Sequence, residues 1–257
     1  MHARFAAGLS ALCEAHQAVR SLHPALETLQ PVAIVEGAQF LVYEAGLQGR
    51  YALALETPVP MPVPAGVRAA FPLEAYGNRP VCVVTGEVFD EPHGLVTLLH
   101  EFIHCYQANT CELPLKQGLS IARQAVERGD YLWELNYPFP YADSLFVECY
   151  SALFRAQALD DFPAIQAVRQ QLHAGIAPDA LEYLHWQEWK EGLARYLENC
   201  MCRQLGLPEN HYGNQQPYDR ISFYEGGAAW IAALAHRDAG LLNDIEALFH
   251  RMAQPSI

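Results

Sequence analysis

The sequence predicts an α+β fold in which a small N-terminal β-sheet is followed by a mainly helical remainder. Segments rich in β-branched and aromatic residues precede residue 90, and segments with apolar residues at helical spacing follow it. The 257 residues, 51% hydrophobic and 18% charged, can bury a sizeable core. We expect a single domain over 1–257. Its β-rich lobe spans 1–90 and includes an N-terminal helix, and its helical lobe spans 91–257.

The first ninety residues contain one expected helix and several expected strands. Apolar side chains recur at helical spacing over 5–19, where we expect an amphipathic helix and not a signal peptide, because no small-residue cleavage site follows. β-branched and aromatic residues separated by glycine-containing turns predict strands within 31–45, 50–56 and 79–89. Four prolines within 57–66 exclude a helix and predict an extended surface loop.

The residues after the last of these strands are predicted to be almost entirely helical. We expect Asp90 to cap the first helix, with Glu91 at the positive end of its dipole and Pro92 in its first turn. Later helices are expected over 115–129, 142–159, 162–175, 179–206 and 222–240. The aromatic stretch 131–141 could wall a pocket or form a packed turn.

Charge, hydropathy and cysteine content exclude several classes of protein. A net charge of −13 argues against a nucleic-acid partner, whose phosphates need a basic surface. We expect no membrane span, since no run of about 18 apolar residues occurs. The seven cysteines are scattered through apolar surroundings, which predicts free thiols and a cytoplasmic location.

The stretch LLHEFIHCYQ, residues 98–107, contains an H-E-x-x-H motif. Four residues on a helix bring His100 and His104 to one face, where both imidazoles could bind one metal ion. Glu101 would then lie beside that ion and could accept a proton from a water that the metal acidifies. The alternative is an ordinary core helix with two hydrogen-bonded histidines.

The segment WKEGLARYLE, residues 189–198, resembles the segment that carries the third zinc ligand in gluzincin metallopeptidases. It is closest to the aminopeptidase N-like family, in which N-E-G-F-A precedes a tyrosine-containing helix. The resemblance implies a zincin-like fold, one zinc ion per chain, and Glu191 as the ligand that joins the two histidines. Glu198, two turns further along, would accept a hydrogen bond from a ligand histidine.

A third segment, FYEGGAAWIAAL at 223–234, resembles the Y-E-K-G-A segment of the same family. The tyrosine of that segment donates a hydrogen bond to the developing oxyanion, a role that the resemblance assigns to Tyr224. The alternative is that a tyrosine before Gly-Gly merely begins a helix.

The sequence departs from the family's pattern in two ways. The gap between His104 and Glu191 is longer than in the family, which leaves Glu148, on an apolar helix where an unpaired carboxylate is costly, as an alternative ligand. The G-x-M-E-N strand that binds a substrate's amino terminus is also absent. We expect the corresponding edge strand within 79–89, where Glu87 is a poor substitute, so aminopeptidase specificity is not carried over.

These motifs together predict a zinc-dependent hydrolase, most readily a metallopeptidase that cleaves a peptide or a small amide. Glu101 would act as general base and later protonate the leaving amine. The alternative is a catalytically inactive zincin-like protein with a binding or regulatory role.

Overall fold

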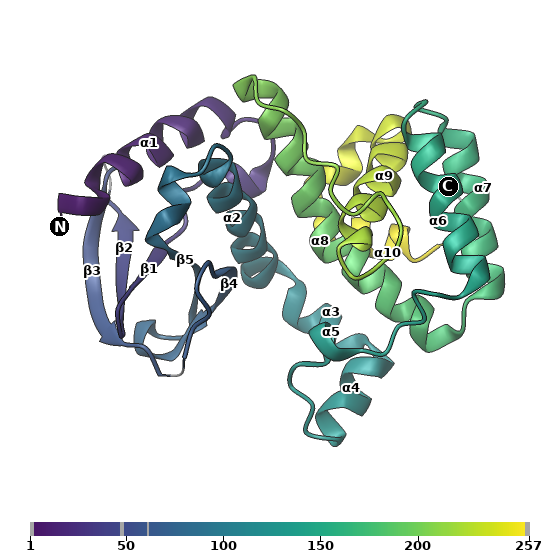
Figure 1. The fold of residues 1–257 in the computed structure, drawn as a ribbon, viewed down its shortest axis with the longest axis horizontal. Coiled ribbons are helices and arrows are strands. Elements are labelled where there is room, and N and C mark those ends of the chain that lie inside the picture. The colour runs from purple at the N-terminus through teal and green to yellow at the C-terminus, as the bar shows by residue number, and fades with distance from the viewer. Residues whose placement is uncertain (1–2, 47–48, 61, 255–257) are drawn as a thin grey trace. The chain divides into compact units, whose positions relative to one another are not determined.

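The computed structural model describes residues 3–46, 49–60 and 62–254, and it shows a five-stranded sheet in a chain that is otherwise mostly helical (Figure 1). The expected α+β class is therefore confirmed. The chain divides into two compact units. Unit 1 consists of Met1–Thr110 and Leu197–Glu209, and unit 2 of Cys111–Tyr196 and Asn210–Ile257. The expectation of one domain with two lobes stays a prediction.

Unit 1 is built on a mixed β-sheet with the strand order β3-β2-β1-β5-β4. Strands β1 and β5 are parallel, and the other neighbours are antiparallel. The strands are β1 (Val32–Glu36), β2 (Gln39–Ala45), β3 (Tyr51–Pro58), β4 (Arg68–Leu73) and β5 (Arg79–Thr85). Two long helices, α1 (Ala3–Val19) and α2 (Gly94–Thr110), belong to the same unit, as do the short 3₁₀ turns η1 (Pro24–Leu26), η2 (Glu74–Tyr76) and η3 (Gly86–Asp90).

Helix α2 is buried around most of its circumference, because it packs against α1, β4, β5 and two of the 3₁₀ turns. Leu98, Leu99, Phe102 and Ile103 are fully buried. A helix with apolar side chains on several sides is fixed in rotation as well as in position. The polar side chains that it carries are consequently held in the interior of unit 1.

The sequence predicted most of unit 1 but not its edge. The expectation that 79–89 supplies an edge strand is wrong, because β5 lies between β1 and β4. The edge next to it is β4, RAAFPL, which was not predicted because alanines and a proline give it little β-propensity. Strand β3 continues to Pro58, and the described residues of the expected loop 57–66 beyond it form neither helix nor strand. Met61 lies outside the described residues.

The start of α2 also differs from the prediction. Asp90 ends the turn η3 instead of capping a helix, and α2 begins at Gly94. A Cβ atom on Gly94 would lie 1.6 Å from the carbonyl oxygen of Val88, so only glycine lets the turn fold back onto the helix start.

Unit 2 is helical. It contains α3 (Glu112–Gly118), α4 (Ser120–Glu127), α5 (Trp133–Asn136), α6 (Ser144–Gln157), α7 (Phe162–Gly175), α9 (Ser222–Arg237), η4 (Ala239–Asn243) and α10 (Ile245–Met252). Helix α8 (Pro178–Leu205) is continuous and contributes its residues 178–196 to unit 2 and 197–205 to unit 1. The helix expected over 115–129 is interrupted at Leu119, and α10 was not predicted.

The aromatic stretch between α4 and α6 is a packed turn. The ring of Phe139 contacts those of Tyr141, Phe146, Tyr183 and Phe223 at centroid distances between 4.9 and 6.0 Å. These contacts, with the buried Trp133, make part of the stretch belong to the core of unit 2, whereas Tyr131 is exposed. None of the helices that the structure describes combines the length and the apolar character that a membrane span requires.

Candidate metal centre

His100 and His104 lie on one face of α2, in the interior of unit 1. Each is 7% exposed. Their Nε2 atoms face each other at 3.2 Å. The expectation that the four-residue spacing places both imidazoles together is confirmed.

The outer nitrogen of each histidine contacts an oxygen acceptor. His100 Nδ1 lies 2.8 Å from Glu198 Oε2, and His104 Nδ1 lies 2.8 Å from Gln107 Oε1. An ionised carboxylate and an amide oxygen only accept hydrogen bonds, so both Nδ1 atoms carry the proton. The predicted contact of Glu198 with a histidine of the motif is confirmed. Gln107 was missed, although its position three residues after His104 places it on a neighbouring part of the helix surface.

This arrangement brings two imidazole nitrogens close together. With protons on both Nδ1 atoms, neutral His100 and His104 would each present an unprotonated Nε2, and two such atoms at 3.2 Å repel unless a cation or a hydrogen-bond donor compensates them. A metal ion is one such cation. Two nitrogens bound to one tetrahedral zinc ion at its usual bond length lie about 3.3 Å apart. The donor atoms therefore fit zinc, and an acceptor on each outer nitrogen is the arrangement typical of metal-binding histidines.

Glu101 occupies the same buried turn of α2 and is 7% exposed. It follows His100 directly and precedes His104 by three residues, so it is a helix neighbour of both. The structure thus brings together the three residues of the H-E-x-x-H motif.

Glu191 and Tyr224, the other two residues that the motifs selected, lie together in unit 2. Glu191 is on α8 with 13% of its side chain exposed, and Tyr224 is in the first turn of α9. The Tyr224 hydroxyl is hydrogen-bonded to the Glu191 carboxylate. Arg220 is a further partner of this carboxylate, with 3.3 Å between Nη1 and Oε1.

Tyr224 is a neutral phenol whose ring lies near two guanidinium groups. Burial raises the pKa of Tyr224 well above its usual value, and the nearby Glu191 carboxylate raises this pKa further. Arg195 and Arg220 lie over the ring, 5.6 and 5.4 Å from its centroid. The hydroxyl therefore remains a hydrogen-bond donor at neutral pH.

A close crossing of α8 and α9 places these residues side by side. A Cβ atom on Gly192 would lie 2.5 Å from Gly227 Cα, and one on Gly227 would lie 2.2 Å from the carbonyl oxygen of Glu188. Both glycines are needed for the two helix backbones to approach this closely. The Gly-Gly pair after Tyr224 thus has a packing function, and that packing brings Tyr224 beside Glu191.

Helix α8 connects the two groups of residues along the chain. Glu191 and Glu198 are seven residues apart on this uninterrupted helix, so they share a face and lie about 10.5 Å apart along its axis. The alternative ligand Glu148 is exposed on α6. The argument for it, which rested on a buried carboxylate, is therefore wrong.

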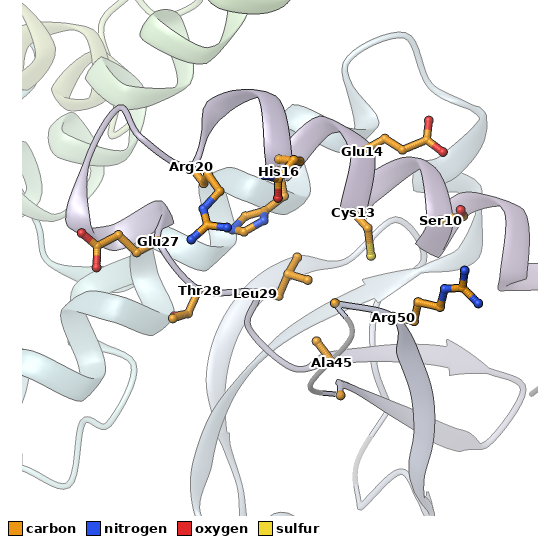
Figure 2. A pocket seen from close by; sticks show the side chains of 13 residues that line it. Ser10, Cys13, Glu14, His16, Arg20, Glu27, Thr28, Leu29, Ala45 and Arg50 are labelled. Carbon is orange, nitrogen blue, oxygen red and sulfur yellow. The ribbon is translucent and has the colours of Figure 1, made fainter.

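Two hollows outside these groups were not predicted. The one in unit 1 has a volume of about 750 Å³, and Figure 2 shows the side chains of Cys13 and His16 from α1, and of Arg20 just after it, among those that line the hollow. His16 Nε2 is buried there without a hydrogen-bond partner. The other hollow, in unit 2, has a volume of about 410 Å³ and is lined in part by His185, whose Nε2 is also buried and unpaired.

The chain matches no family model, no curated protein and no solved structure. The resemblance to gluzincins is therefore carried by the motif residues alone.

Proposed function

We propose that the protein is a zinc-dependent hydrolase of zincin-like fold, in which His100, His104 and Glu191 bind one zinc ion. The observation that carries the proposal is the pair of facing Nε2 atoms, 3.2 Å apart, with Glu198 and Gln107 on the outer nitrogens. The resemblance of residues 189–198 to a third-ligand segment supplies Glu191 as the carboxylate that would join the two histidines. Two imidazoles and a carboxylate are a common ligand set of catalytic zinc.

The continuity of α8 supports Glu191 as the third ligand. Its neighbour on the same helix face, Glu198, accepts the hydrogen bond of His100 inside unit 1. The Glu191 carboxylate is also largely shielded from water, and Tyr224 and Arg220 hold it in position.

A zinc ion bound by these residues would polarise the scissile carbonyl and acidify a water. Glu101 would accept the proton of the attacking water and transfer it to the leaving nitrogen. Tyr224 would donate a hydrogen bond to the oxygen that develops negative charge. Such chemistry suits hydrolysis of a peptide or a small amide. The seven free cysteines support a cytoplasmic location as part of the same proposal.

One observation favours a second candidate, an inactive zincin-like protein that binds a partner. Arg220 already compensates the charge of Glu191 and Tyr224 is hydrogen-bonded to it, so this carboxylate has structural partners without a metal. Metal content separates the two candidates.

The test is the zinc content of purified protein, measured by mass spectrometry after zinc loading and desalting. We expect about one zinc per chain in the wild type and in Glu148→Gln, whose exposed carboxylate makes it the matched control. Glu191→Gln and His104→Ala should lose the metal. A wild-type chain that retains no zinc would refute the proposal, and loss of zinc in Glu148→Gln alone would move the third ligand.

A further inference from the structure

The guanidinium of Arg220 is a cation beside Glu191 that solvent reaches. Its side chain is 27% exposed, and it approaches Gln187 Oε1 at 3.4 Å and Glu191 Oε1 at 3.3 Å. Both contacts are made through Nη1, and both are long for hydrogen bonds. Tyr224 is a third side-chain partner.

These contacts do not use all the donors of Arg220. A guanidinium has five N–H groups in a planar fork, and the hydrogen bonds to Gln187 and Glu191 engage one of its terminal nitrogens, Nη1. The fork matches the two oxygens of a carboxylate, which it binds with paired charge-assisted hydrogen bonds. Arg220 can therefore bind an anionic group by donating further hydrogen bonds, in addition to those it makes to its present partners.

The other cationic side chains near Glu191 form ion pairs or hydrogen bonds with other groups. Lys190 pairs with Glu112 at 2.7 Å and with Glu134 at 3.0 Å. Arg195 is 4% exposed, donates to the carbonyl oxygens of Asn210 and Tyr212, and lies 3.7 Å from Glu225. Of the three cations, Arg220 has the most exposed side chain, at 27% against 19% for Lys190 and 5% for Arg195.

Metal binding would increase the need for an anion at this position. In the structure, the charges of Arg220 and Glu191 offset each other. A divalent cation on Glu191 would share that carboxylate and repel the guanidinium, which leaves an excess of positive charge beside the reacting bond. An excess of positive charge at this position favours an anionic group on the substrate.

We infer that Arg220 binds a carboxylate of the peptide substrate, and hence that the enzyme acts on peptides with a carboxylate close to the cleaved bond. The inference rests on the proposed function. The carboxylate is either the C-terminus of the peptide or an acidic side chain, and both present the same pair of oxygens to the guanidinium.

The test uses zinc-loaded Glu101→Gln, which should bind peptides without cleaving them. Three probes are titrated by calorimetry: acetyl-trialanine with a free C-terminal carboxylate, its C-terminal amide, and the amide with one alanine replaced by aspartate. We expect at least one of the two carboxylate-bearing probes to bind about 10- to 100-fold tighter than the neutral amide. Preference for the free acid would assign the C-terminus, and preference for the aspartyl amide would assign a side chain.

The variant Arg220→Gln, combined with Glu101→Gln, should lose this preference while it retains zinc. Arg220→Lys should keep part of the preference, and Arg155→Gln, which removes an exposed arginine of α6, should keep all of it. Equal affinity for all three probes in zinc-loaded protein, or no binding of any, would overturn the inference alone. Loss of zinc in Arg220→Gln would also overturn it, because Arg220 would then serve to hold Glu191. Absence of zinc from Glu101→Gln and from the wild type would instead refute the proposed function.

Discussion

The histidine pair illustrates how partners outside a site determine which atoms a residue offers to it. The carboxylate of Glu198 and the amide oxygen of Gln107 each accept the Nδ1 proton of one ring, so both rings present Nε2 to the same point. Without these acceptors either nitrogen could carry the proton. If the pair binds a metal as proposed, the two hydrogen bonds would orient both rings before the metal arrives.

Removal of the acceptor from His100 should weaken metal binding without abolishing it. We expect Glu198→Ala to reduce zinc affinity by about 10- to 100-fold, because the ring loses its fixed tautomer and orientation. Competition with a chromophoric chelator measures the affinity. Glu209→Ala, which removes a carboxylate of unit 1 that pairs with Arg203 at the surface, is the control and should bind zinc normally. Equal affinities for both variants would exclude this role of Glu198.

Glu101 should be needed for turnover but not for the metal. Glu101→Gln keeps the shape of the side chain and removes its ability to accept a proton, so we expect it to retain about one zinc and to lose about 10²- to 10⁴-fold in kcat. Zinc content and hydrolysis rate are measured on the same preparation. Normal hydrolysis by this variant would show that the assigned mechanism is wrong.

Single residues were predictable where helix periodicity fixes their neighbours. The pairing of His100 with His104 follows from a four-residue spacing, and the contact of Glu198 followed from the motif resemblance. Gln107 was missed because a glutamine three residues from a histidine has no distinctive signal. The ion pair between Arg220 and Glu191 was not predicted, because it depends on the path of the loop that carries Arg220 past α8.

Elements were predictable in proportion to their length and hydrophobic pattern. The helices α1, α6, α7 and α8 have long amphipathic or apolar patterns and were found close to their predicted bounds. The edge strand β4 and the short helix α10 were not, because few residues and mixed composition leave little pattern. The late start of α2 was not predicted either. It depends on the contact between Gly94 and the preceding turn, and local helix propensity does not reveal such a contact.

The crossing of α8 and α9 should tolerate no side chain at Gly227. We expect Gly227→Ala to lower the free energy of unfolding by about 1–3 kcal/mol, because the added methyl group would overlap the carbonyl of Glu188. Gly118→Ala is the matched control. No atom lies within 4 Å of a Cβ there, so it should be neutral or slightly stabilising. Thermal and urea denaturation measure both, and equal stability of the two variants would contradict the close crossing.

The whole molecule should become less stable as the pH falls from 7 to 5. Burial lowers the pKa of His16, His173 and His185, so the folded chain binds fewer protons than the unfolded chain once the pH is below about 6.5. Each such histidine lowers the free energy of unfolding by up to about 1.4 kcal/mol for each pH unit. This decrease stops once the pH is below the pKa of the histidine in the folded chain. Above about pH 8 all three are neutral in both states, and they add no pH dependence.

Urea denaturation of wild type and His185→Asn at several pH values isolates the contribution of His185. Glu188, whose pKa is raised by burial, acts in the opposite direction in both proteins, so it cancels in the comparison. We expect a smaller loss of stability between pH 7 and 5 in the variant. Identical pH profiles would show that His185 is not held neutral in the folded chain.

Unit 1 consists of two stretches of sequence, and this has a consequence for the order in which the protein is made. Leu197–Glu209 leaves the ribosome only after most of unit 2, and Glu198 follows His100 by 98 residues. At ordinary rates of translation this delay is about 5–20 s. A nascent chain that has just completed α2 therefore has the H-E-x-x-H histidines but not the acceptor that orients the first of them. Assembly of the site is in this way deferred until the chain has passed through α8.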